Sequence, residues 1–253
     1  MTLDRVIAVR NNKTVYRDGE RCIKVFSSRY SKADILNEAL NQARIEETGL
    51  NVPKVLEVTV IEGKWSIVSE YIKGKTLAQL MEENPEKKEQ YLQLLVQLQL
   101  QVHSKTAPLL TKLKDKLTRK IAQSGFDASV RGSLQARLEA MPKQTRVCHG
   151  DFDPSNIIIT DGGEPYIVDW SHAAQGNSLA DVACTYLLLC LRGDEEGAKR
   201  YLDIFCQASG TEPQEVYKWL PMVAAAKSVR GNEQQRRQLC GWVLAQQSKE
   251  AKA

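Results

Sequence analysis

The residues of this chain best suited to chemistry lie in a polar loop and the hairpin that follows it. The loop runs from His149 to Asn156, and two short apolar segments, Ile157–Thr160 and Tyr166–Val168, flank Asp161-Gly162-Gly163. β-Branched segments on either side of Asp-Gly-Gly predict a β-hairpin. A regular hairpin centred between the two glycines would hold Asn156 opposite Asp169, about 5 Å apart.

Three oxygen-bearing side chains in this stretch suggest a reaction. Asn156 and Asp169 carry the oxygen ligands that Mg²⁺ prefers, at about 2.1 Å. Asp151 lies near the apex of the loop. A carboxylate beside a two-ligand metal site predicts phosphoryl transfer, in which the metal holds a polyphosphate and the third acid orients a hydroxyl. The alternative is a surface hairpin whose Asp and Asn serve only turn chemistry.

The composition limits the class of protein. A chain of 253 residues that is 42% hydrophobic can bury one large core or two small ones. Its net charge of +4, with no basic block, does not indicate nucleic-acid binding. The six cysteines form no C-x-x-C pair, which favours a reducing compartment over a disulfide framework or a zinc site.

Targeting and membrane signals are also lacking in the sequence. The N-terminus has no signal-peptide pattern, and the longest nearly apolar run, Val182–Leu191, is too short to span a bilayer. We therefore predict a cytoplasmic protein that binds neither a membrane nor nucleic acid. The oligomeric state cannot be predicted from these features.

The first third of the chain predicts an antiparallel sheet with one helix. Hairpin signals at Asp18-Gly19 and Glu62-Gly63-Lys64 connect apolar segments of strand length. A helix with Ser31 as its N-cap should follow the third strand and end at Gly49. The five predicted strands are Val6–Val9, Thr14–Arg17, Arg21–Phe26, Val55–Ile61 and Trp65–Tyr71.

Two charged residues in this region, Lys24 and Glu38, could form an ion pair. Lys24 lies within the apolar strand Cys22–Phe26, where an unpaired ammonium would be costly to bury. Glu38 lies at the border of the apolar stripe of the helix and could reach Lys24. Such a pair could contact nucleotide phosphates. In the simpler alternative, strand alternation places Lys24 on a solvent face and Glu38 is a solvated helix residue.

The segment Ser69–Gly74 predicts a junction between two domains. It is extended, and the sequence after it becomes mostly helical. An extended segment in a cleft offers free carbonyl and amide groups that could bind the edge of an adenine. We place the boundary here, with a nucleotide-binding domain at residues 1–72 and a helical domain with the catalytic loop and acceptor site at residues 73–253.

Helical periodicity and apolar runs account for most of the second domain. Asp181 begins one of the predicted helices. It could be a first-turn acid favoured by the helix dipole, a hydrogen-bond acceptor for the catalytic loop, or both. The predicted helices are Leu77–Glu83, Glu86–His103, two centred on Leu117 and Leu134, Asp181–Leu191, Glu195–Ser209, Gln214–Lys227 and Glu233–Gln247.

Together these motifs resemble the aminoglycoside phosphotransferase and choline kinase-like family. The loop H-G-D-F-D-P-S-N and the later I-V-D-W match the spacing of that family, as do the lysine of C-I-K-V-F, Glu38 and the S-E-Y-I-K-G segment. The resemblance covers residues 6–190. It implies an α+β, two-lobed protein-kinase-like fold, with a small N-terminal lobe of five antiparallel strands and one helix and a larger helical C-terminal lobe.

The resemblance also implies an activity and its nucleotide site. The protein would be a kinase of a small hydroxylated molecule that uses ATP and Mg²⁺. Lys24 would hold the α- and β-phosphates and Glu38 would orient it. The carbonyl of Glu70 and the amide of Ile72 would meet the adenine.

The remaining roles that the resemblance implies fall on the loop and hairpin. Asn156 and Asp169 would bind Mg²⁺, and Asp151 would accept or orient the proton of the acceptor hydroxyl. His149 and Asp181 would support the loop. Electrostatic stabilisation would supply most of the acceleration.

Some features depart from the family pattern. The first predicted turn contains no glycine, and the charges after Leu191 are nearly balanced. Aminoglycosides are polycations that require an acidic pocket, so a neutral or anionic acceptor is at least as compatible with the sequence.

Other classes of protein remain as alternatives. The main one is a nucleotide-binding pseudokinase or regulatory module. A protein kinase would need more chain between Asp169 and Asp181 to form a peptide platform. A metallohydrolase using His149, Asp151, Asp153 and His172 would leave the strand lysine without a role.

Overall fold

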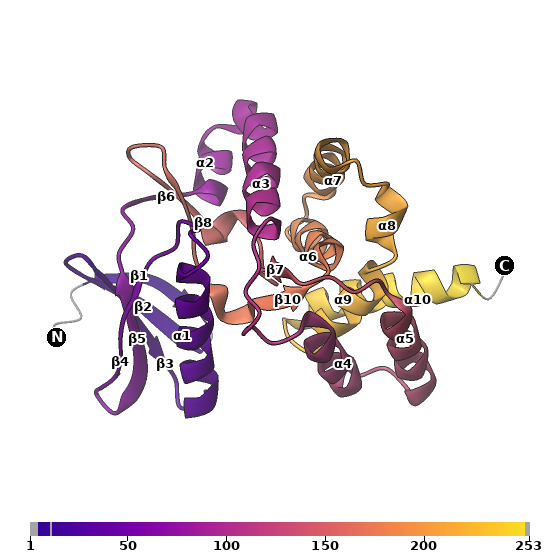
Figure 1. Ribbon diagram of the computed structural model, residues 1–253, viewed down its shortest axis with the longest axis horizontal. Helices are drawn as coiled ribbons and strands as arrows, with labels where there is room; N and C mark the ends of the chain where they lie inside the picture. The colour runs from indigo at the N-terminus through magenta and orange to yellow at the C-terminus, as the bar shows by residue number, and fades with distance from the viewer. Residues whose placement is uncertain (1–4, 11, 251–253) are drawn as a thin grey trace. The chain divides into compact units, whose positions relative to one another are not determined.

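A computed structural model describes residues 5–10 and 12–250 (Figure 1). The chain forms two compact units. The first contains the residues up to Glu86 together with Pro154–Ala173, and the second contains Lys87–Asp153 together with the residues from Ala174 onward. This division by compactness differs from the predicted boundary at residues 72/73, because the hairpin after the polar loop belongs with the N-terminal residues.

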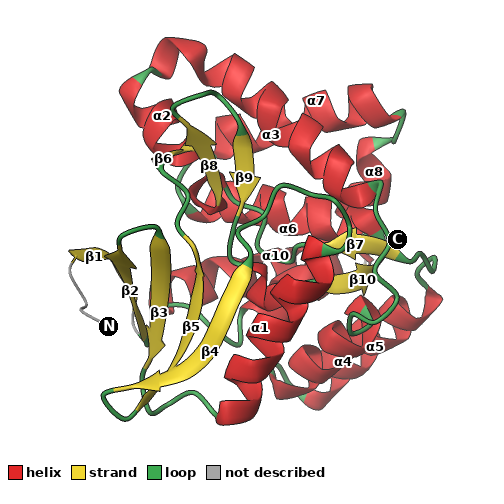
Figure 2. Cartoon of the chain, turned by 60° about the vertical axis from the view of Figure 1, so that its left-hand side comes forward, coloured by secondary structure: helices red, strands yellow, loops and turns green. Residues whose placement is uncertain are grey.

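The first unit contains the predicted five-stranded antiparallel sheet, which is confirmed. Its strand order is β1-β2-β3-β5-β4, and α1 packs against β4 and β5 (Figure 2). Phe26, Ile35, Ala39 and Ile67 form the core between sheet and helix. The bounds are β1 Arg5–Arg10, β2 Lys13–Asp18, β3 Arg21–Phe26, α1 Lys32–Glu46, β4 Val55–Ile61 and β5 Lys64–Glu70.

The start of α1 follows from its capping residue. Ser31 has extended backbone angles, and its hydroxyl accepts a hydrogen bond from the Asp34 amide at 3.1 Å. This bond satisfies one of the amides that the first helical turn leaves without a backbone partner. The cap therefore fixes where α1 begins.

A second, three-stranded sheet completes the first unit. It has the order β6-β8-β9, and its strands are β6 Gly74–Thr76, β8 Ile157–Thr160 and β9 Pro165–Ile167. We did not predict β6, because Lys73-Gly74-Lys75 carries turn and charge signals rather than a strand pattern. Its pairing with β8 is one of the contacts that join Pro154–Ala173 to the first unit.

The second unit is mostly helical. Strands β7 Arg146–Cys148 and β10 Ala174–Gly176 form a short antiparallel pair beside the helices. Asn177 caps α6 through its side chain, so this helix begins three residues before the predicted start at Asp181. The helices are α3 Lys88–His103, α4 Leu113–Gln123, α5 Ala128–Ala140, α6 Ser178–Leu191, α7 Glu195–Ser209, α8 Pro213–Tyr217, α9 Leu220–Lys227 and α10 Glu233–Glu250; α2 Leu77–Glu83 belongs to the first unit.

The prediction of one helix over Gln214–Lys227 was wrong. The structure has two helices there: α8 ends at Tyr217 and α9 begins at Leu220, so Lys218 and Trp219 separate them. Pro221 explains the break, because it has no amide hydrogen to donate to the carbonyl of Tyr217 and its ring clashes with that turn of a continuous helix. In the part of the chain that the structure describes, no helix is both long and apolar enough to cross a membrane.

The close approach of β6 to β8 requires a glycine at position 74. A Cβ built on Gly74 would lie 2.1 Å from the carbonyl oxygen of Ile159, which is backbone and cannot move aside cheaply. We predict that Gly74→Ala lowers the free energy of unfolding by about 1–3 kcal/mol, through this overpacking. Urea unfolding followed by circular dichroism would measure the change.

A matched control is available for this substitution. Gly132 lies in α5 with open space around its Cβ position. Gly132→Ala should leave stability unchanged or raise it by about 0.5–1 kcal/mol, because alanine favours the helix. Equal effects of the two substitutions would show that the β6–β8 approach does not constrain position 74.

Candidate functional site

Lys24 and Glu38 form a buried ion pair in the first unit. Lys24 Nζ donates to Glu38 Oε1 at 2.5 Å, and the side chains are 17% and 8% exposed. Strand β3 supplies the lysine and α1 the carboxylate, so the helix–sheet packing sets the distance. Burial would lower the pKa of Lys24, but Asp169 and Glu38 raise it above its ordinary value, so the ammonium stays charged.

Asp169 joins this pair, and a second lysine does the same. Lys24 Nζ lies 3.4 Å from Asp169 Oδ1, and Lys13 Nζ lies 3.0 Å from Asp169 Oδ2 and 3.9 Å from Glu38 Oε1. Two lysines and two carboxylates therefore form one cluster. Burial would raise the pKa of Asp169, but Lys24 and Lys13 hold it well below its usual range.

Asp169 is positioned by its neighbours along the chain. Its φ of 62° lies in the left-handed region, which is uncommon for residues other than glycine. The next residue, Trp170, is fully buried, and the 3₁₀ turn Trp170–His172 packs against α1, the helix that carries Glu38. The buried Trp170 indole and the left-handed backbone of Asp169 thus direct the Asp169 carboxylate toward Lys24 and Lys13. Strained backbone of this kind is common at functional sites.

The register of the hairpin corrects one prediction. Asn156 does not stand opposite Asp169: Ile157 pairs with Ile167, and the Asn156 carbonyl accepts a hydrogen bond from the Val168 amide at 2.9 Å. The hairpin is centred on Gly162 rather than between Gly162 and Gly163, because Gly163 adopts a left-handed conformation with φ of 83° in a loop of three residues. Asp169 therefore lies one residue beyond the paired position.

The predicted adenine-binding segment begins with Ser69 and Glu70, the last two residues of β5. The Glu70 amide donates to the Lys54 carbonyl at 3.0 Å, and the Tyr71 amide donates to the Glu20 carbonyl at 2.9 Å. The chain then continues without regular structure through Ile72 to β6. These two bonds fix the end of the strand that carries the Glu70 carbonyl.

In the second unit, Asp181 holds the start of the polar loop. Its carboxylate accepts hydrogen bonds from the His149 amide at 3.0 Å and the Gly150 amide at 2.7 Å, and it lies 3.0 Å from His103 Nε2. Burial would raise the pKa of Asp181, but the bonds from His103 and Gly150 bring it below its ordinary value. The imidazole of His149 accepts a hydrogen bond from the Asp151 amide at 3.2 Å.

The rest of the loop is fixed by other residues of α6. The Cys184 thiol donates to the Gly150 carbonyl at 3.3 Å, and the Thr185 hydroxyl donates to the Phe152 carbonyl at 2.9 Å. Gln99 of α3 donates to Thr185 at 3.1 Å, and the buried Tyr201 hydroxyl donates to Gln99. Three helices thus contribute to a buried polar network that supports the loop backbone.

The side chains of Asp151 and Asp153 have different partners. Asp153 is buried and forms an ion pair with Arg192 at the end of α6. Asp151 is 34% exposed, and Lys227 Nζ of α9 donates to its Oδ1 at 3.2 Å. Asp151 is therefore the carboxylate of this loop that solvent can reach, whereas Asp153 stabilises the loop.

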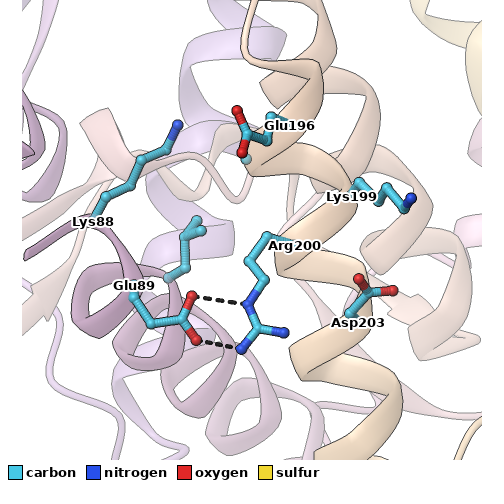
Figure 3. A pocket seen from close by; sticks show the side chains of 8 residues that line it. Lys88, Glu89, Glu196, Lys199, Arg200 and Asp203 are labelled. Carbon is cyan, nitrogen blue, oxygen red and sulfur yellow. Dashed lines mark hydrogen bonds and ion pairs between the residues drawn. The ribbon is translucent and has the colours of Figure 1, made fainter.

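Two hollows in the second unit do not include Asp151. One, of about 490 Å³, lies between α3 and α7, and Figure 3 shows Glu89 and Arg200 pointing toward each other across it. Some of its lining charges are paired: Arg200 Nε donates to Glu89 at 2.8 Å, and Lys88 is paired with Asp194. The other, of about 730 Å³, is lined by α4, α5 and Trp219.

The sequence motifs named three residues of this cluster, Lys24, Glu38 and Asp169, but not Lys13. Lys13 is the first residue of β2, one residue before the predicted start of that strand at Thr14. A signal was present: the Asp18-Gly19 hairpin pairs Val15 with Lys24, so strand alternation places Lys13 on the same face as Lys24.

Comparison with known proteins identifies the family. A model of the phosphotransferase enzyme family (APH) matches residues 5–220, so the chain belongs to that family. The match confirms the family that the motifs resembled and, with it, the prediction of an enzyme of the small-molecule kinase type. No match was found among curated protein sequences.

Solved structures share the fold at low sequence identity. An aminoglycoside-3'-phosphotransferase of type VIII has a TM-score of 0.66 and 17% identity, covering 89% of this chain and 92% of that one. Choline kinase LicA from Streptococcus pneumoniae has a TM-score of 0.65 and 13% identity, covering 97% and 94%. These likenesses confirm the predicted α+β, protein-kinase-like fold class.

A third similar structure contains bound molecules. It is a thermostable mutant of aminoglycoside phosphotransferase APH(4)-Ia in a ternary complex with ADP and hygromycin B. Its TM-score is 0.69 and its identity 16%, covering 95% of this chain and 91% of that one.

The contacts of Asp181 predict a pH-dependent contribution to stability. At pH 7, Asp181→Asn should lower the free energy of unfolding by about 2–3 kcal/mol, because buried hydrogen bonds to a charged acceptor are lost. Folding lowers the pKa of this carboxyl. The contribution should therefore be complete above the unfolded pKa of about 3.9 and decline as the pH falls through the lower folded value.

Urea unfolding of both proteins between pH 3 and pH 7 would test this. Asp203→Asn, on α7, is the control carboxylate and should change stability little at any pH. A stability difference between the native chain and Asp181→Asn that grows toward pH 3 would contradict the assigned direction.

Proposed function

We propose that this phosphotransferase is an ATP- and Mg²⁺-dependent kinase that moves the γ-phosphoryl group of ATP to a hydroxyl of a small molecule. The observation that carries the proposal is the cluster in which Lys24 donates to Glu38 and lies 3.4 Å from Asp169. Burying ion pairs stabilises a fold weakly or not at all, so a cluster of four charges is better explained by a ligand than by folding.

The first unit would bind the nucleotide. Lys24 would contact the α- and β-phosphates, with Glu38 orienting it. Lys13 would add a second cation on the same face of the sheet. The Glu70 carbonyl and the Ile72 amide would meet the adenine edge. The similar APH(4)-Ia structure with ADP supports a nucleotide site in this fold.

Asn156 and Asp169 would hold Mg²⁺. They fit that ion by their chemistry, since one offers an amide oxygen and the other a carboxylate that its lysine neighbours keep ionised. The ion would neutralise charge on the transferring phosphoryl group. Lys13 and Lys24, which pair with Asp169 here, would then be available to phosphate oxygens.

Asp151 would orient the acceptor hydroxyl and accept its proton. Its partial exposure suits contact with a substrate. His149 and Asp181 would keep the loop backbone in place without touching the reacting atoms. In this scheme residues 1–72 serve the nucleotide, residues 73–253 carry the catalytic loop and the acceptor site, and the segment 154–173 brings the metal ligands to the first unit.

The six cysteines are free thiols, which supports a cytoplasmic location for this activity. The second candidate function is a nucleotide-binding pseudokinase. Release of ADP from ATP in the presence of Mg²⁺, measured across sugars, amino alcohols, nucleosides and aminoglycosides, separates the two. Stabilisation by ATP with no ADP release from any acceptor would favour the pseudokinase.

The role of Asp151 predicts a separation of chemistry from binding. Asp151→Asn should lower kcat by about 10²–10⁴-fold, the range expected when a positioned general base is removed. The Kd for ATP should change less than threefold. Isothermal titration with ATP and Mg²⁺, beside the turnover assay, would measure both. Loss of ATP binding in parallel with activity would contradict the role assigned to Asp151.

The lysines of the charge cluster predict the opposite pattern. Lys24→Met and Lys13→Met should each weaken ATP binding by about tenfold or more, because each removes a charge-assisted contact to phosphate. Lys64→Met, at an exposed position of the same sheet, is the control and should leave the Kd unchanged. Unchanged ATP affinity in Lys13→Met would show that this lysine serves the fold alone.

A further inference from the structure

A group of four cations lies in the second unit beside the polar loop. Helix α4 carries Lys116 and Lys120 one turn apart. Helix α9 packs against α4 and ends at Lys227 (Figure 1). Arg230 follows one turn later, with its amide bonded to the Lys227 carbonyl at 3.0 Å. We call Lys116, Lys120, Lys227 and Arg230 the basic cluster.

Two members of the basic cluster, Lys227 and Lys120, act on the carboxylate to which we assign the acceptor hydroxyl. Lys227 Nζ donates to Asp151 Oδ1 at 3.2 Å, and its side chain is 20% exposed. Lys120 interacts electrostatically with Lys227, Arg230 and Asp151. Lys116 and Lys120 are half-buried, and Arg230 is exposed. A solute that reaches Asp151 would therefore meet several positive charges.

The basic cluster holds like charges close together. Burial and then the neighbouring cations lower the pKa values of Lys116 and Lys120 to about 8. Asp151 is the carboxylate that acts on both Lys120 and Lys227. Like charges held together in a partly buried place are unfavourable, and a bound anion would relieve that repulsion.

We propose that the acceptor is an anionic hydroxyl compound, whose phosphate or carboxylate group binds to the basic cluster while its hydroxyl faces Asp151. This inference rests on the proposed function, because it takes Asp151 as the residue that orients the hydroxyl. A polycationic aminoglycoside would place its ammonium groups against these lysines, at an electrostatic cost.

Lys227 connects the two parts of this site. It is paired with Asp151 here, and an acceptor anion would draw its ammonium away from that carboxylate. The oxygen of Asp151 that Lys227 occupies would then be free for the hydroxyl proton. An anionic acceptor would in this way both anchor itself and release the base.

A panel of acceptors matched in shape but not in charge would test the inference. Glucose, glucosamine, glucuronate and glucose 6-phosphate form one such set, and glycerol, serinol, glycerate and glycerol 3-phosphate another. We expect kcat/KM, measured by ADP release, to be at least about tenfold higher for an anionic member than for its neutral analogue. Comparison of the phosphate member with the carboxylate member of each set shows which of the two anionic groups the basic cluster binds. A neutral or cationic member with the highest kcat/KM would overturn the inference and leave the kinase proposal standing.

Variants of the basic cluster supply a second readout. Lys120→Gln combined with Arg230→Gln should raise the KM for an anionic acceptor by about 100-fold, at about tenfold for each lost cation, with the KM for ATP unchanged. Lys120→Arg should retain most of the affinity. Lys218→Gln, at an exposed position paired with Glu215, is the control. An unchanged KM in the double variant would overturn the inference.

A binding measurement covers the case in which no acceptor of the panel turns over. Inorganic phosphate, titrated into ADP-saturated protein, should bind the native chain and Lys218→Gln but bind the double variant at least about tenfold more weakly. Equal binding to all three would overturn the inference. Failure of ADP to stabilise the protein against heat would instead count against the proposed function.

Discussion

The ion pair between Lys24 and Glu38 sets the geometry on which the first unit depends. A lysine on the face of a sheet and a carboxylate on a helix can meet at 2.5 Å only if the helix packs at one depth and one rotation. Ser31 fixes where that helix begins, and the core of Phe26, Ile35 and Ile67 fixes its depth. The carboxylate of Asp169 then completes the cluster because Trp170 is buried against the same helix. Capping, packing and charge therefore determine one arrangement together.

The loop that carries Asp151 is held by different means. Its backbone is bound by Asp181, Cys184 and Thr185, which lie along one face of α6 at helical spacing. Backbone atoms take part in most of these bonds, so side chains of the loop can point elsewhere. The side chain of Asp153 forms an ion pair with Arg192, whereas that of Asp151 stays accessible to solvent. A backbone held by these bonds, with one reachable carboxylate, is consistent with the role that we propose for Asp151.

The sequence was sufficient for features that depend on local pattern. The strands of the five-stranded sheet follow from the alternation of apolar residues, and the start of α1 follows from its capping residue. The spacing of the motifs named Lys24, Glu38 and Asp169, which the structure brings together. The register of the β8–β9 hairpin did not follow, because a glycine that takes a left-handed conformation adds a residue to the loop. Strand β6 was missed because its partner lies more than eighty residues later in the chain. The neighbours of Asp151 could not be predicted from the sequence either. Lys227 and Lys120 approach it through the packing of helices, which no local sequence pattern encodes.

The pairing of β6 with β8 has a consequence for how the chain folds during synthesis. The N-terminal part of the first unit leaves the ribosome well before its last strands, because residues 87–153 of the second unit are made in between. At about 5–20 residues per second, this interval is on the order of several seconds. Throughout that time β6 cannot pair with β8, and Lys24 cannot form its ion pair with Asp169. Closing a loop of this length costs entropy, so the last step of folding for the first unit is a long-range one. Completion of that unit is therefore coupled to synthesis of the intervening helices, although its sheet could assemble early.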